Sequence, residues 1–125
     1  MSVTHPAAVR TIIADAVVDS IDVGGAGTLI FNTSGDVEVV TLAFGATAFG
    51  AASGPTATAN AITEDSNATG GTVAKFAMAN GSAAAAGFAG SVTATGGGGD
   101  ITLTSLTIGA SDTVQVSSLT YTAPV

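Results

Sequence analysis

Small side chains dominate this sequence and limit the apolar surface that the chain can bury. Of its 125 residues, 72 are Ala, Gly, Thr or Ser, and only 30 are Val, Ile, Leu or Phe. Ala alone supplies 25 of the residues behind the hydrophobic fraction of 46%. Large apolar residues are therefore only slightly more frequent than in chains that lack the apolar mass to fold. The length is that of one domain, so we predict a single domain over residues 1–125 with a small hydrophobic core.

The few charged residues exclude several classes of function. Two Lys and Arg stand against nine Asp and Glu, which gives a net charge of −7. Binding to a nucleic acid requires many contacts from Lys and Arg to phosphates, so we expect no nucleic-acid partner. The absence of Cys and the single His exclude thiolate and His-rich metal sites. No run of about 18 apolar residues is present to span a bilayer, so we expect no membrane partner.

The clearest periodic pattern lies near the N-terminus. Apolar residues at positions 9, 12, 13, 16, 17 and 21 have the spacing of one helix face. Thr4 is a candidate N-cap, and Gly24 and Gly25 are candidates for the C-terminal cap. We predict an N-terminal arm and helix over residues 5–22, with this apolar face packed on the rest of the protein.

Most of the remaining chain has the composition of β-strands. Predicted strands occupy residues 28–31, 37–44, 72–78 and 87–95, with turn-forming residues between them. Two similar segments, 100–107 and 112–120, each begin with Asp after a turn and contain Ser-Leu-Thr, and they predict a C-terminal hairpin. The fold class is therefore mainly β, with one N-terminal α-helix and an antiparallel β-sandwich over residues 27–123. Jelly-roll and immunoglobulin-like sandwiches both remain open.

Candidate partner contacts lie in the arm and in a long connection. Residues 45–61 are almost all small, and Phe49 is their only large side chain. Connections of this length without regular structure commonly contact a partner. The candidate partner-contact residues are His5, Pro6, Arg10, Phe49 and Pro55.

Two groups of acidic residues have alternative interpretations. The helix carries an acidic stripe of Asp15, Asp19 and Asp22, which is either solvated or a docking edge for a basic partner. Residues 65–70 match the first half of a calcium loop, D-x-N-x-T-G, but Phe76 replaces the Glu at the twelfth position. A turn bonded by its own side chains is the simpler interpretation, and an ion site there stays open.

No pattern in the sequence predicts catalysis. His5 is the only imidazole and lies next to the chain start, whereas a catalytic base needs a fixed position with a partner. Residues 96–99 are four glycines without a following Lys or helix, so they do not form a phosphate-binding loop. We predict that the protein is not an enzyme and has no catalytic, cofactor or metal site.

Several stretches of the chain resemble a family of small structural proteins of tailed bacteriophages. The opening VRTIIADAVVD at residues 9–19 fits the family pattern V-R-x-x-I-A-D-A-V-V-D. Further similar stretches, in the same order, are GTL (27–29), TLAF (41–44), AFGAA (48–52), ATANAI (57–62), Gly109, TV (113–114) and SLTYT (118–122). The chain departs from the pattern at residues 83–86 and 96–99, where small residues replace more polar ones.

The resemblance implies a virion protein, and we expect a decoration or cement protein on the outer surface of the phage capsid. Its partners would be the major capsid protein and copies of itself, in a trimer. A small protein with few large apolar residues gains stability from association, which fits such a role. The alternatives are a tail or head-fibre component and a module that binds host-surface glycans. The lack of Trp counts against glycan binding.

Overall fold

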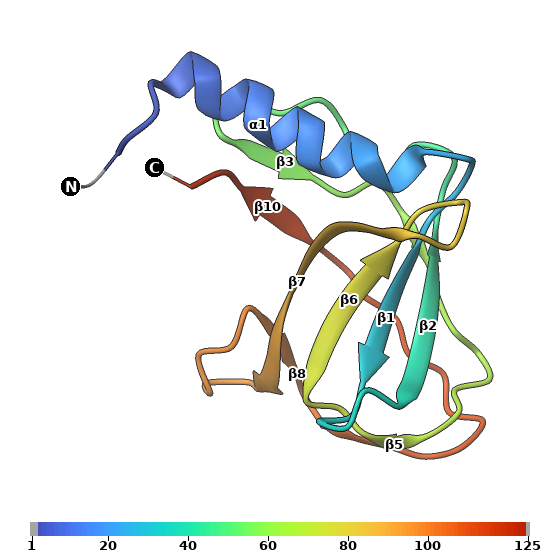
Figure 1. Ribbon diagram of the computed structural model, residues 1–125. Coiled ribbons are helices and arrows are strands. Elements are labelled where there is room, and N and C mark those ends of the chain that lie inside the picture. The colour runs from blue at the N-terminus through green and yellow to red at the C-terminus, as the bar shows by residue number, and fades with distance from the viewer. Residues whose placement is uncertain (1–2, 125) are drawn as a thin grey trace.

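A computed structural model describes residues 3–124 and contains one curled six-stranded sheet with two small sheets beside it (Figure 1). The elements are α1 (Ala7–Asp19), the 3-10 turn η1 (Ser20–Asp22), β1 (Thr28–Asn32), β2 (Glu38–Phe44), β3 (Thr56–Thr58), β4 (Ile62–Thr63), β5 (Gly71–Thr72), β6 (Lys75–Ala79), β7 (Ala85–Ala94), β8 (Ile101–Leu103), β9 (Thr107–Ile108) and β10 (Thr120–Thr122). The predicted fold class, mainly β with one N-terminal helix, is confirmed, and the mostly antiparallel sheet is consistent with a β-sandwich-like fold.

The large sheet has the strand order β4-β2-β1-β6-β7-β8. All of its neighbouring strands are antiparallel except β7 and β8, which are parallel. The two small sheets pair β10 with β3 and β5 with β9, so they join distant parts of the chain. In Figure 1, α1 lies across one end of the large sheet, beside β3 and β10.

The predicted hairpin over residues 28–44 is confirmed as β1 and β2. Side chains alternate between buried and partly exposed along β1, which places Leu29 and Phe31 in the core. The turn between the strands is closed by Thr33, whose hydroxyl oxygen accepts hydrogen bonds from the backbone of Gly35 and Val37. Short side chains of this kind favour turns because they bond the nearby backbone.

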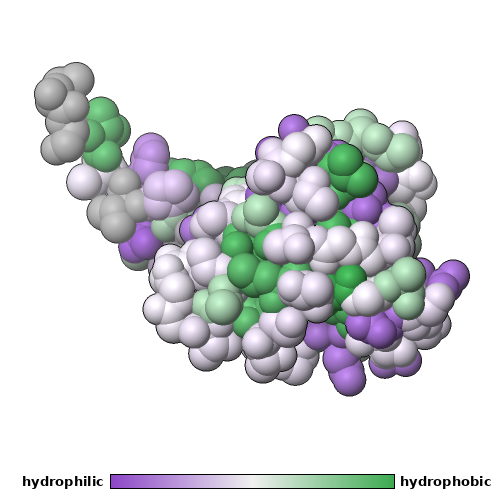
Figure 2. Space-filling model, turned by 90° about the horizontal axis from the view of Figure 1, so that it is seen from below, coloured by the Kyte–Doolittle hydropathy of each residue, from purple (hydrophilic) through white to green (hydrophobic). Residues whose placement is uncertain are grey.

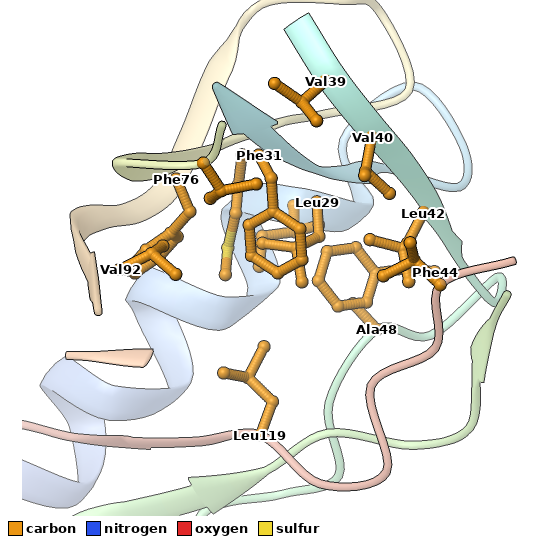
Figure 3. Packing of buried hydrophobic residues seen from close by; sticks show 14 of the residues in the cluster. Leu29, Phe31, Val39, Val40, Leu42, Phe44, Ala48, Phe76, Val92 and Leu119 are labelled. Atoms are coloured by element: carbon orange, nitrogen blue, oxygen red, sulfur yellow. The ribbon is translucent and has the colours of Figure 1, made fainter. Parts of the chain in front are cut away.

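The core lies on the concave side of the curled sheet and collects side chains from the sheet, the helix and the C-terminal segment. Figure 3 shows rings and aliphatic side chains from β1, β2 and β6 converging with Leu119 of the C-terminal segment. Val18 and Ile21 bring the end of α1 and the η1 turn into the same cluster. The small apolar content is therefore concentrated in one cluster.

The helix is present where it was predicted, but it buries only part of the predicted face. Ile21 is buried as predicted, whereas Val9 and Ile12 are exposed and Ala14 and Val18 are buried instead. Polar side chains on the inner side hydrogen-bond other segments, which rotates part of the apolar stripe towards solvent. The predicted N-cap, Thr4, is wrong, because α1 begins after Pro6 and has no side-chain cap.

The predicted C-terminal hairpin is wrong. The glycine tract 96–99 turns the chain back, and β8 then pairs with β7 in parallel. Two of these glycines approach Thr93 so closely that a Cβ atom would overlap it, which explains the need for glycine. Residues 112–120 instead bond the segment 59–68 through Asp65–Val114 and Ala59–Leu119 backbone contacts. The two segments therefore pair with distant parts of the chain and not with each other, although their sequences are similar.

Substitution Gly27→Ala tests the close packing of the η1 turn on the sheet. A Cβ atom at Gly27 would lie 2.5 Å from the carbonyl oxygen of Ala79 and from Cγ2 of Ile21. We expect the free energy of unfolding to fall by about 1–3 kcal/mol, because overpacking displaces backbone. The matched control is Gly35→Ala, where the nearest atom is 3.8 Å away. Equal urea-denaturation midpoints for the two variants would contradict the predicted overlap.

Candidate interaction surface

Phe49 belongs to the core and not to the surface. Only 3% of the residue is exposed, and its ring centroid lies 5.9 Å from that of Phe44 and 6.1 Å from that of Phe88. The connection 45–61 predicted as a partner surface is therefore anchored in its own molecule. The ring of Phe49 offers no surface that a partner could reach in this conformation, so the predicted partner contact at Phe49 is wrong.

The acidic stripe on the helix is divided between two roles. The Asp15 carboxylate accepts a hydrogen bond from the backbone N–H of Ala52 at 2.8 Å, and the Asp22 carboxylate accepts one from Ala48 at 2.9 Å. Asp19 is exposed. Two of the three carboxylates thus fix the connection 45–61 onto the helix, where its backbone donors would otherwise lack a partner.

Arg10 and Pro55 meet at the C-terminal segment. Arg10 Nη2 donates a hydrogen bond to the carbonyl oxygen of Ala123 at 2.9 Å, and the Ala123 N–H donates to the carbonyl of Pro55 at 2.9 Å. Both candidate contact residues are partly buried by this arrangement. Their observed contacts hold α1, β3 and β10 together, and a role in partner binding stays a prediction.

His5 and Pro6 precede α1, and Figure 1 shows the chain before α1 leading away from the sheets. Residues 3–8 are all exposed. The hydrogen bonds of this stretch within the described part of the chain come from residues that begin the helix. The arm is therefore available to another molecule, which keeps the predicted contact role of His5 and Pro6 open.

Residues 65–70 form a turn that is held by one internal hydrogen bond and by bonds to β2. The Asp65 carboxylate accepts hydrogen bonds from the N–H groups of Asn67 and Thr41 at 2.9 and 3.1 Å. The Thr69 hydroxyl donates to the Glu38 carboxylate at 2.6 Å. Among residues 3–124, no group of three or more His, Cys, Asp or Glu side chains could hold a metal ion.

Four of the five exposed large apolar side chains lie in the N-terminal part of the described chain. Val3 in the arm and Ile12 in α1 are each 67% exposed, and Val9 and Val23 are also exposed. Val37, with 63% exposure, lies instead in the turn between β1 and β2. Isolated apolar side chains are common on protein surfaces, whereas contiguous apolar patches mark contact sites.

A groove of about 490 Å³ separates β8 from residues 115–120. No pattern in the sequence predicted this groove. Ile101, Leu103 and Val116 are among its partly buried apolar residues, and Thr and Ser side chains line the remainder. Figure 2, which views the molecule from below, shows apolar side chains among weakly polar ones. The sequence contained one signal, the lack of Lys and Pro in residues 100–104, which does not by itself locate a groove.

Asp100 is the only charged side chain among the groove-lining residues of the described chain. The backbone N–H of Ser91 donates a hydrogen bond to its carboxylate at 2.9 Å, and the Ser91 hydroxyl donates a second at 3.0 Å. These bonds lower the pKa of Asp100 below its ordinary value, because they stabilise the ionised form. One end of the groove therefore carries a negative charge at neutral pH.

Comparisons with known proteins give no relative for this chain. A scan against protein-family models finds no match, and searches of curated proteins and solved structures find no significantly similar protein. No helix among residues 3–124 is long and apolar enough to span a membrane.

Substitution Phe49→Ala tests the assignment of this ring to the core. We expect the free energy of unfolding to fall by about 3–5 kcal/mol, because the change removes a buried ring and leaves a cavity. Chemical denaturation measures the loss, and Val37→Ala serves as the control at an exposed site, where we expect about 0.5 kcal/mol or less. A Phe49→Ala variant as stable as the control would return Phe49 to the surface.

Proposed function

We propose that the protein is a structural, non-enzymatic component of a tailed-bacteriophage virion. Its place would be the outer surface of the capsid, where it binds the major capsid protein as a decoration or cement protein. The resemblance over residues 9–19 and the later ordered stretches supports this proposal. The mechanism is mechanical, because added buried interface between neighbouring capsid subunits stabilises the shell against internal pressure.

The observation that carries the proposal is the exposure of Val9 and Ile12 on α1 beside a projecting arm. Both lie outside the core although the chain has few large apolar residues. Burial of one such side chain in an interface contributes about 1.5–3 kcal/mol. A shell protein bound to this part of α1 would bury both, and repetition over the lattice multiplies the gain.

Small side chains on the rest of the surface suit the same role. Ala, Gly, Thr and Ser allow close approach of two surfaces and lose little rotamer entropy on burial. The single Lys of the chain, Lys75, forms a salt bridge with Asp36 at 2.6 Å. We further propose that copies associate around local symmetry axes as trimers, since homo-oligomers close by symmetry.

A tail or head-fibre location is the second candidate, because the same surface could bind a different virion protein. Glycan binding is weaker on physical grounds. Carbohydrate sites use exposed aromatic platforms, and every aromatic ring among residues 3–124 is buried or partly buried. The rings of Phe88 and Tyr121, the most accessible of the six, stack on each other at 4.8 Å.

Cryo-electron microscopy of particles made by a phage that encodes this chain separates the locations. We expect density for the protein in many copies on the outside of the head, with α1 facing the shell. Density confined to the tail or to fibres would support the second candidate. Particles that lack the chain by mass spectrometry would overturn the virion proposal altogether.

Substitution Ile12→Glu tests which surface binds the head. We expect binding to heads that lack the protein to weaken about tenfold or more, since a charge replaces an apolar contact worth at least about 1.4 kcal/mol. Val37→Glu is the matched control, because Val37 is 63% exposed and Ile12 67%. Sedimentation of heads with the added protein measures the bound fraction. Equal binding by the two variants would contradict a capsid contact at Ile12 on α1.

A further inference from the structure

The groove between β8 and residues 115–120 has the shape and chemistry of a missing strand position. Its volume is about 490 Å³, enough for a few residues of extended chain. Partly buried apolar side chains from both sides lie beneath Thr and Ser side chains at its rim. An extended segment with small or apolar side chains would complement these walls.

Both sides of the groove present free backbone groups. The N–H of Thr95 donates to the carbonyl of Leu103 at 3.0 Å, so the backbone groups of Leu103 face β7 and those of Thr102 face the groove. On the opposite side, the N–H of Ala59 donates to the carbonyl of Leu119 at 2.8 Å. By the same alternation, the backbone groups of Thr120 point away from β3.

The β8 edge lacks most of the features that block strand addition. Proteins protect exposed edges with short strands, Lys, Pro, inward charges or bulges, and β8 has only the first of these, a length of three residues. Residues 101–104 contain only Ile, Thr and Leu, and the pairing of β7 with β8 is regular. Asp100 marks one end of the open edge and leaves the three strand residues uncharged.

The N-terminal arm has the conformation that such an edge accepts. Pro6 has φ −58° and ψ 155°, and a residue before proline is restricted to extended conformations, which places His5 in line for a strand. Residues 3–5 are exposed and equal in number to the residues of β8. Pro6 has no N–H to donate, so strand pairing ends there.

We propose that this groove binds the N-terminal arm of a second copy of the protein as an added β-strand. The arm leads away from the sheets in Figure 1, so a neighbouring copy offers the accessible groove. Residues 3–6 carry no carboxylate, and His5 is the only imidazole of an acidic chain. The arm therefore brings no negative charge towards Asp100.

The contact joins two different surfaces of each copy. Repeated arm-into-groove contacts close a ring when the rotation between copies allows it. This inference concerns association of the protein with itself and does not depend on the phage assignment. Failure of head binding and failure of arm exchange are therefore separate results.

Cysteine cross-linking tests the contact directly, because the chain has no Cys of its own. Thr4 is central in the arm and Thr102 is central in β8, so the two residues lie opposite each other whether the added strand is parallel or antiparallel. Thr4→Cys protein labelled with ¹⁵N is mixed with unlabelled Thr102→Cys protein under mild oxidation. Mass spectrometry then counts the mixed disulfide.

We expect the mixed disulfide to exceed, by about tenfold or more, that of a control pair, because bound strands raise the effective concentration of the two thiols. The control pairs Thr4→Cys with Ser34→Cys, an exposed site in the turn between β1 and β2. Equal yields from the two mixtures would overturn the proposal.

A second pair of variants tests the backbone contact. Thr102→Pro removes the N–H that faces the groove and fixes φ at this position, whereas Thr102→Ala keeps the N–H. We expect analytical ultracentrifugation to give oligomers for the Ala variant and monomers for the Pro variant, with circular dichroism confirming that both are folded. An unsubstituted protein that stays monomeric at all concentrations, or a Pro variant that associates as the Ala variant does, would overturn the proposal. If the Pro variant does not fold, the cross-linking result decides.

Discussion

Packing between Phe49 and Phe88 holds together three parts of the molecule. Phe49 comes from the long connection and Phe88 from β7, and Phe88 also contacts Phe76 of β6 and Tyr121 of β10. Aromatic pairs of this geometry contribute about 0.5–1.5 kcal/mol beyond their buried area. In a chain with few large side chains, the sheet, the connection and the C-terminal strand depend on these rings.

The position of the connection in turn determines which side of α1 is free. Asp15 and Asp22 bond the backbone of Ala52 and Ala48, and Thr11 donates to the carbonyl of Gly54. These bonds pair polar groups of the helix with the backbone of the connection, and they direct the polar side of the helix inwards. Ile12 is consequently exposed, and the proposed capsid contact follows from the polar contacts on the inner side.

The proposed association between copies involves the β8 edge and the N-terminal arm. The large sheet ends at β8, whose outer backbone groups are not paired by any described strand of the molecule. The arm precedes α1, and its described residues are exposed. Each surface is incomplete alone, and each has the chemistry to complete the other. The proposed self-association and the proposed shell binding use different surfaces, so the two contacts are compatible in one assembly.

The sequence by itself determined the mainly β fold class, the N-terminal helix and the β1–β2 hairpin, because these depend on residue types close together in the chain. Only the tertiary structure decided the burial of Phe49, the orientation of α1 and the partners of β8 and residues 112–120. The sequence predicted His5 and Pro6 as candidate contacts, and this role stays a prediction. The groove could not be predicted, because it requires β8 and residues 115–120 to lie side by side. The physical reason is that burial and strand pairing depend on which surfaces and backbone edges remain free after distant segments have packed.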